Sequence, residues 1–161
     1  MKGKPEVLKV LQEMLREELG AIIQYIMHSE MCENWGYERL SKHIKKESIN
    51  EMGHAEKLVE RMLFLEGMPN LGELPKLNIG KDVKQQFEND LALEKGAVAA
   101  YNEAIATCRK LGDNATADFL QGILADEEGH VDFIEEQLGL IAQVGLQNYL
   151  AQQIGEQAEA G

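Results

Sequence analysis

The chain has 161 residues, with a hydrophobic fraction of 44% and an aromatic fraction of only 6%. This length suits a single domain with a sizeable core, and the scarcity of aromatic residues favours helices over sheets. Acidic residues outnumber basic ones by 28 to 16, for a net charge of −12 and without a long uncharged apolar run, so we expect neither nucleic-acid binding nor a membrane segment.

Two long helices are predicted in the first half of the sequence. Apolar residues recur at helical spacing from Val7 to Ile26, which indicates a helix over about 5–34. A turn at Gly36 interrupts the pattern, and a second helix is predicted over about 37–65. At 1.5 Å per residue, each helix would be about 40–45 Å long.

Residues 67–80 are predicted to form a long connection between helices. Two prolines and three glycines exclude a continuous helix in this stretch. When extended, these residues reach about 46–50 Å, which matches the length of the preceding helix. We therefore expect the connection to span the bundle and the third helix to run parallel to the second. This single crossover is typical of ferritin-like four-helix bundles.

The second half of the sequence predicts two further long helices and a short fifth one. Their expected ranges are 82–111, 114–144 and 146–155. Asp113 or Asn114 is a good N-cap for the fourth helix, and Gly145 separates it from the fifth. The fifth helix carries an apolar stripe, which we expect to pack against another subunit. We expect residues 157–161 to fray, within an all-α single domain that covers 1–161.

A set of metal-binding residue types occurs twice at one fixed offset. The two copies are Glu18, Glu51 and His54, and, 76 positions later, Glu94, Glu127 and His130. In a Glu-x-x-His unit both side chains lie on one helix face, but a single unit arises often by chance on charged helices. Glu18 also falls within an apolar stripe, where a carboxylate is costly unless it is paired or binds a metal. The repeat therefore predicts a two-metal carboxylate site between four helices.

The charges of this set match two divalent cations, because four carboxylates balance them and the imidazoles are neutral. Without metal, we expect the crowded carboxylates to have raised pKa values. Glutamate and histidine discriminate little among iron, manganese and zinc, so a redox role is an additional inference. Tyr25 could hydrogen-bond a ligand or carry an electron, and a core tyrosine is an equally good interpretation. For His28 and His43 we expect packing or surface positions, with an auxiliary metal site at His28 as the alternative.

Over nearly its whole length the sequence resembles the bacterioferritin family. The segments that carry the resemblance are residues 1–3, 47–54, 63–67, 76–80, 126–130 and 145–150. The resemblance implies that the six repeated residues are ferroxidase ligands, with Glu51 and Glu127 bridging two irons. It also implies that the protein oxidises Fe²⁺ with O₂ or H₂O₂. The ferric mineral would be stored inside a homo-oligomeric shell of 24 subunits built from two-fold pairs.

Met52 has a separate role in the resemblance. It lies about 100° around the helix from Glu51, so it should point away from the metal site. The resemblance implies that Met52 is an axial ligand of haem b, bound between two subunits. It also makes a ferredoxin-type protein a candidate electron donor. Some members hold an additional iron on the inner surface with a histidine and an aspartate; Lys46 and Asn50 occupy those positions here, so we do not expect that site.

The main alternative is a non-storage diiron oxidase or peroxidase of the rubrerythrin kind. Such proteins usually carry a CxxC rubredoxin module, which this sequence lacks. Haem-free ferritins commonly lack the second Glu-x-x-His, and a purely structural oligomer has no need of six buried ligands. Cys32 and Cys108 lie far apart, which favours reduced thiols in a cytoplasmic protein.

Overall fold

The structure is a computed structural model that describes residues 1–155, and in this range it contains helices and no strand. The helices are α1 (Pro5–Asn34), α2 (Glu38–Phe64), α3 (Val83–Lys110), α4 (Asn114–Val144) and α5 (Leu146–Ala151). The tail expected to fray, 157–161, lies outside the described residues. No helix within the described range combines the length and the apolar character needed to cross a membrane.

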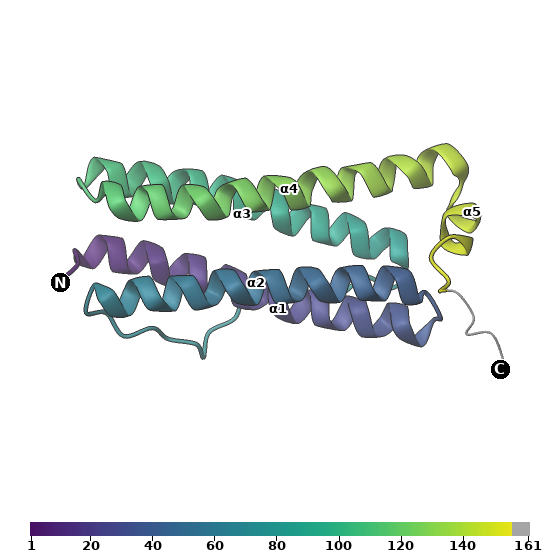
Figure 1. Cartoon of the computed structure of the whole chain (residues 1–161), viewed down its shortest axis with the longest axis horizontal. Coiled ribbons are helices and arrows are strands. Elements are labelled where there is room, and N and C mark those ends of the chain that lie inside the picture. The colour runs from purple at the N-terminus through teal and green to yellow at the C-terminus, as the bar shows by residue number, and fades with distance from the viewer. Residues whose placement is uncertain (156–161) are drawn as a thin grey trace.

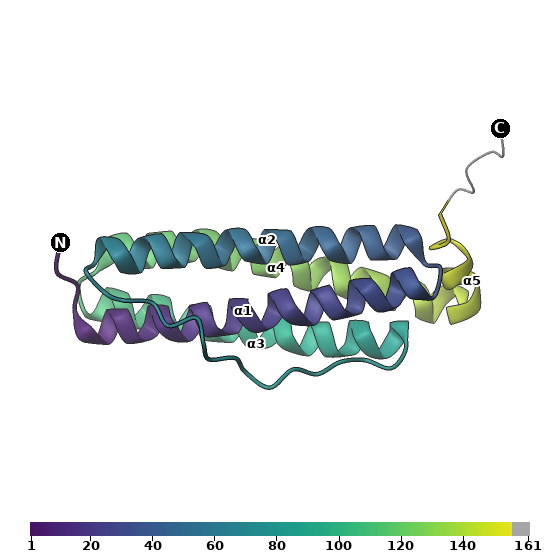
Figure 2. The same cartoon turned by 90° about the horizontal axis from the view of Figure 1, so that it is seen from below.

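The four long helices form a bundle of two antiparallel hairpins (Figure 1). α1 packs mainly against α2 and α3 mainly against α4, while α1 and α3 join the hairpins. The connection between α2 and α3 runs along the bundle outside α1, so that α2 and α3 point in the same direction (Figure 2). The predicted all-α bundle with a single long crossover is therefore confirmed.

The crossover lies directly on α1 because Gly20 leaves room for it. A Cβ atom at Gly20 would lie 2.4 Å from the Pro75 ring, so any larger side chain would push the connection away. Further along, the backbone N–H of Asn78 donates a hydrogen bond to the Gln24 side chain at 3.0 Å. The connection is thus fixed to the bundle although it has no regular secondary structure.

The helix bounds agree with the predictions to within a residue except at α5. The side chain of Asp113 accepts a hydrogen bond from Thr116 N–H at 3.0 Å, which confirms an N-cap at the start of α4. The prediction that the fifth helix continues to 155 is wrong, because it ends at Ala151. Backbone and side-chain N–H groups of Arg39, in the first turn of α2, donate to the carbonyls of residues 152–153, which draws these residues out of the helix.

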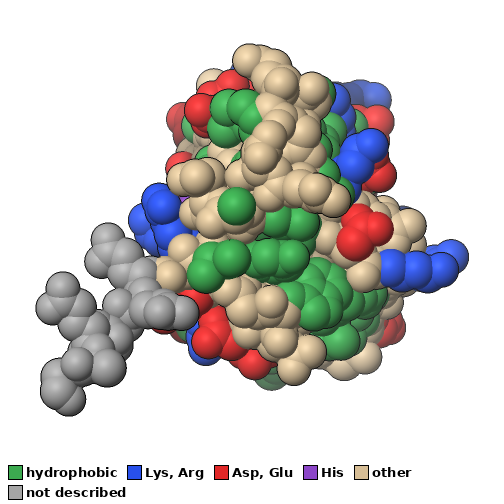
Figure 3. Space-filling model, turned by 90° about the vertical axis from the view of Figure 1, so that its right-hand side faces the viewer, with side chains coloured by type: hydrophobic (Ala, Val, Ile, Leu, Met, Phe, Trp, Pro, Cys, Tyr) green, Lys and Arg blue, Asp and Glu red, His purple; other side chains and the backbone are tan. Residues whose placement is uncertain are grey.

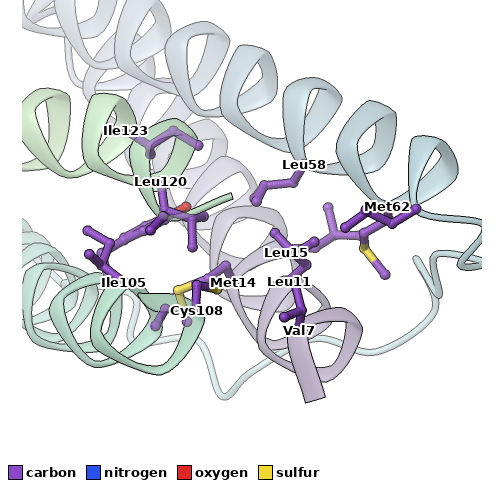
Figure 4. Packing of buried hydrophobic residues seen from close by; sticks show 14 of the residues in the cluster. Val7, Leu11, Met14, Leu15, Leu58, Met62, Ile105, Cys108, Leu120 and Ile123 are labelled. Atoms are coloured by element: carbon purple, nitrogen blue, oxygen red, sulfur yellow. The ribbon is translucent and has the colours of Figure 1, made fainter. Parts of the chain in front are cut away.

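Two apolar clusters fill the bundle, one towards each end. The cluster near the N-terminus includes Leu11, Leu15, Leu58 and Leu120, all wholly buried (Figure 4). The second cluster lies towards α5 and includes residues from all five helices. The level between them, near residue 18 of α1, is occupied by polar side chains. The metal-ligand pattern therefore falls in the middle of the bundle, with apolar packing on both sides.

The end of the bundle that carries α5 has an apolar surface (Figure 3). A hollow of about 400 Å³ is lined there mainly by Trp35, Tyr37, Val83, Leu146 and Leu150. On α5 itself, Tyr149 is buried against the bundle. The predicted contact of this segment with another subunit remains a prediction.

Candidate metal centre

The six residues of the repeated pattern converge midway along the bundle. α1 and α3 each contribute one glutamate, and α2 and α4 each contribute a Glu-x-x-His unit. The carboxylates are almost completely buried, and only His130 is slightly accessible. Because charged groups are rarely buried without a partner, this convergence requires a compensating charge or proton.

The side chains form two overlapping sets of candidate ligands. One set consists of Glu18, Glu51, His54 and Glu127, and the other of Glu51, Glu94, Glu127 and His130. Within each set, one ligand atom from every residue lies within 4.8 Å of the others. Glu51 and Glu127 belong to both sets. The arrangement therefore suits two cations that share two carboxylates, with one further glutamate and one histidine for each cation.

Both histidines turn the same ring nitrogen towards the carboxylates. Nδ1 of His54 lies 2.9 Å from Glu51 and 3.0 Å from Glu127. Nδ1 of His130 lies 2.9 Å from the other oxygen of Glu51. In each ring Nε2 points away from the cluster, so Nδ1 is the candidate metal ligand.

Several of these atoms are buried without a hydrogen bond. Oxygens of Glu51, Glu94 and Glu127, together with Nδ1 of His130, find no hydrogen-bond partner among the described residues. The ion pairs that involve some of them are short but poorly aligned for a hydrogen bond. Unsatisfied buried polar atoms are costly, and their clustering at one point fits metal coordination.

Burial and neighbouring charges shift the pKa values of these side chains in opposite directions. Burial raises the pKa of Glu18 and of Glu94 well above the usual glutamate range. Burial alone would lower the pKa of His54, but the adjacent carboxylates of Glu127, Glu18 and Glu51 outweigh it and raise the pKa to about 12. For Glu127 the opposite holds, because both histidines offset burial and lower its pKa. The raised pKa values of Glu18 and Glu94 favour protons on these carboxylates, and cations that bind there would displace them.

Two tyrosines connect the halves of the repeat across this centre. The Tyr25 hydroxyl donates a hydrogen bond to Glu94, and the Tyr101 hydroxyl donates one to Glu18. Of the interpretations left open for Tyr25, the hydrogen bond to a candidate ligand is the one that the structure contains. Tyr101 was not predicted as a site residue. It lies 76 positions after Tyr25, which is the offset of the repeat, so the repeat could have identified it.

Two further carboxylates contact the histidines from outside the cluster. Nε2 of His130 lies 2.9 Å from Glu47, and Nε2 of His54 lies 3.1 Å from Asp126. All four side chains line a hollow of about 560 Å³ that opens beside the centre. Neither carboxylate belongs to the repeat, and each contacts a helix distant in sequence, so spacing alone gave no signal for them.

Met52 lies apart from the metal centre, as predicted. Its side chain is 46% exposed, and Ile49, one turn away on α2, is also exposed. A hydrogen bond of 3.0 Å from Ser48 to the Ile22 carbonyl places this part of α2 beside α1, where Ile23 is exposed as well. The thioether therefore stands on an apolar part of the outer surface.

The two unmatched histidines have different surroundings. His28 is wholly buried and contacts Asp90 at 3.0 Å, so it is a packing residue. His43 is partly buried and stacks on Phe133 with ring centroids 3.9 Å apart. Within residues 1–155, neither belongs to a group of three or more metal-binding side chains.

This bundle and its buried carboxylate–histidine centre define a ferritin-like protein, and the family model for the ferritin-like domain matches residues 8–144. Among known relatives, a bacterioferritin of Brucella melitensis is 47% identical over 92% of both chains. Bacterioferritins of Mycolicibacterium paratuberculosis and Mycobacterium tuberculosis are 45% and 43% identical, over 94% of this chain and 96% of theirs. The chain therefore belongs to the bacterioferritin family.

Proposed function

We propose that the protein stores iron and oxidises Fe²⁺ at the six-residue centre. The observation that carries this proposal is the pair of overlapping ligand sets that share Glu51 and Glu127. Two Fe²⁺ ions bring a charge of +4, which offsets four buried carboxylates. Each ion would take oxygen ligands and one imidazole nitrogen, a ligand set that suits iron.

The proposed reaction transfers one electron from each of two Fe²⁺ ions. With O₂ as the oxidant, two electrons and two protons give H₂O₂. With H₂O₂ as the oxidant, two electrons and two protons give two water molecules. The shared carboxylates would hold two ions close enough to react with one oxidant molecule, and the hollow beside the histidines would admit ions and oxidant.

We further infer that the protein assembles into a 24-subunit shell of two-fold pairs, in the cytoplasm, with haem b between paired subunits. Family membership supports the shell, and the two buried free thiols of Cys32 and Cys108 suit a reducing compartment. The Met52 side chain fits haem because it is 46% exposed and because Ile49 and Ile23 on the same part of the surface are also exposed. Haem supplies one-electron chemistry, and a ferredoxin-type protein is the proposed donor for iron release.

The decisive experiment for the metal centre compares Glu18→Ala with Glu13→Ala. Glu13 lies on the same helix but is exposed, and within residues 1–155 its one ion pair is with Arg16, so its removal should leave activity unchanged. Glu18→Ala removes a buried ligand and should slow the initial rate of Fe²⁺ oxidation by about tenfold or more. The rate is measured by stopped-flow absorbance on protein given two Fe²⁺ per chain. A wild-type rate in Glu18→Ala would exclude this centre as the ferroxidase.

The storage part of the proposal needs a separate measurement. Light scattering gives the mass of the assembly, and iron analysis after aerobic loading gives the content per assembly. A shell of 24 chains should retain far more iron than two ions per chain. A small assembly that oxidises Fe²⁺ without retaining it would instead favour the non-storage oxidase of the rubrerythrin kind.

A further inference from the structure

We propose that Glu47 and Asp126 position the two ligand histidines with unequal strength, so that the two metal positions differ in affinity. The position formed with Glu94 and His130 would be the tighter one. This inference rests on the proposed dinuclear centre and adds a property of that centre that its six ligands do not determine. It concerns residues that contact the histidines from outside and would not touch the metals.

The first step of the argument is the orientation of the rings. Nδ1 of each histidine faces the cluster, which leaves Nε2 to carry the ring proton when Nδ1 binds a metal. That N–H would donate to Glu47 from His130 and to Asp126 from His54. A carboxylate in this place fixes the tautomer and the ring orientation, and it raises the basicity of the ligating nitrogen.

Glu47 is held firmly in this role. Its side chain is only 16% exposed, and Asn50 donates a hydrogen bond to it at 3.3 Å. Nε2 of His43 lies 3.5 Å from its other oxygen, and that ring is stacked on Phe133. Glu47 therefore has three polar neighbours in a half-closed environment, where a charge-assisted hydrogen bond is strong.

This arrangement also gives Asn50 a function. An aspartate at this position would repel Glu47, whereas the amide of Asn50 donates to it. The departure from the family pattern at this position is therefore consistent with a carboxylate that supports His130.

Asp126 supports His54 much less firmly. Its side chain is 58% exposed, and His54 is its only hydrogen-bond or ion-pair partner in the described part of the chain. Water competes for an exposed carboxylate and screens its charge, so such a contact contributes little. Without the Asp126 carboxylate, water would accept the hydrogen bond from the Nε2–H group of His54, at a small cost in free energy.

The inequality between the two positions follows from these contacts. Each position otherwise has the same composition, with one unshared glutamate, one histidine and two shared carboxylates. The tyrosines are also equivalent, because each unshared glutamate accepts one phenolic hydrogen bond. The carboxylates outside the histidines therefore distinguish the two positions.

The test is an anaerobic titration of the full-length metal-free assembly with Co²⁺, followed by its visible absorption bands. Wild-type protein should bind two Co²⁺ per chain in two steps of different affinity. Glu47→Gln should weaken the tighter step by about 10–100-fold, while Asp126→Asn should weaken the other step by less than about tenfold. His130→Ala identifies the step, because it must abolish the one that Glu47→Gln weakens.

Exposed carboxylates on the same helices provide matched controls. Glu56→Gln on α2 and Glu128→Gln on α4 should leave both steps unchanged. Wild-type affinities in Glu47→Gln, or equal losses in the Glu47 and Asp126 variants, would overturn the inference and leave the dinuclear centre standing. Failure of the wild-type protein to bind a second Co²⁺ would overturn the dinuclear centre itself and this inference with it.

Discussion

At the scale of single residues, the metal centre combines side chains that the sequence predicts with others that it does not. Glu18 and Glu94 were recognisable because residue type, apolar surroundings and a fixed offset coincide. Glu47 and Asp126 are ordinary acidic residues in the sequence, and their contacts depend on the packing of α2 against α4. Spacing along a helix therefore identifies candidate ligands, whereas support from a neighbouring helix requires the folded structure.

Cys32 provides a prediction at this scale. The thiol is wholly buried and lies 3.3 Å from the Gln86 side chain, and burial raises its pKa from 9.0 to about 12. At pH 8, the thiolate fraction then falls from about one in ten to about one in ten thousand. The thiolate is the reactive form, so native protein should be alkylated at least about a thousandfold more slowly than unfolded protein.

This rate is measured by mass spectrometry of peptides after timed treatment with iodoacetamide at pH 8. Because a raised pKa keeps the thiol protonated until the pH approaches 12, an increase to pH 9 should leave the native thiol largely unreactive. Protein unfolded in urea is the control and should react at both pH values. Rapid alkylation of Cys32 in the native protein would contradict its buried, protonated state.

At the scale of elements, the sequence predicts the crossover as a long connection but does not predict how the crossover is bonded to the bundle. Prolines and glycines indicate where α2 ends and how far the chain must travel. The attachment uses Gln24 and His28 on α1 together with Asp90 on α3, which lies more than 60 residues further along the chain. Gln24 and His28 both contact the Asp90 carboxylate, at 2.8 and 3.0 Å, and His28 Nε2 accepts from Gly80 N–H at 3.0 Å. Sequence patterns give no signal for such a buried network.

Replacement of Asp90 by asparagine should loosen the crossover. Asparagine has one oxygen and one NH₂ group in place of the two carboxylate oxygens. The NH₂ group would therefore face the N–H group of Gln24 or of His28, and one of these buried donors would lack an acceptor. An unsatisfied buried donor costs about 1–3 kcal/mol. We expect a lower thermal midpoint and faster hydrogen exchange in peptides that cover residues 76–82.

The matched variant for this experiment is Glu88→Gln, because Glu88 lies on the same helix and is exposed, and it makes a surface ion pair with Lys84. Its exchange pattern should equal that of the wild type. Unchanged exchange in Asp90→Asn would show that the network does not hold the crossover in place.

At the scale of the whole molecule, the outer surface carries apolar residues that the single chain leaves uncovered. Met52 and Met27 are each 46% exposed, on α2 and α1 respectively. If paired subunits bind haem through Met52, the holoprotein should contain one haem for two chains. Met52→Leu should lose haem and its absorption bands, whereas Met27→Leu should retain them.

Haem content is measured by absorption after reconstitution, and subunit pairing by light scattering of the same samples. Leucine keeps the apolar surface, so Met52→Leu should still assemble. Retention of an unchanged haem spectrum by Met52→Leu would remove the haem assignment, and loss of assembly with retained haem would assign Met52 to packing.

The long crossover has one further consequence, which concerns symmetry. Two identical hairpins, paired as separate chains, would have to surround both cations with identical groups. A single chain is free of this constraint, and the positions that match Glu47 and Asp126 in the opposite hairpin are Ile123 and Asn50. Because the crossover joins two unlike hairpins, it permits the two cation positions of a nearly symmetric centre to differ in affinity.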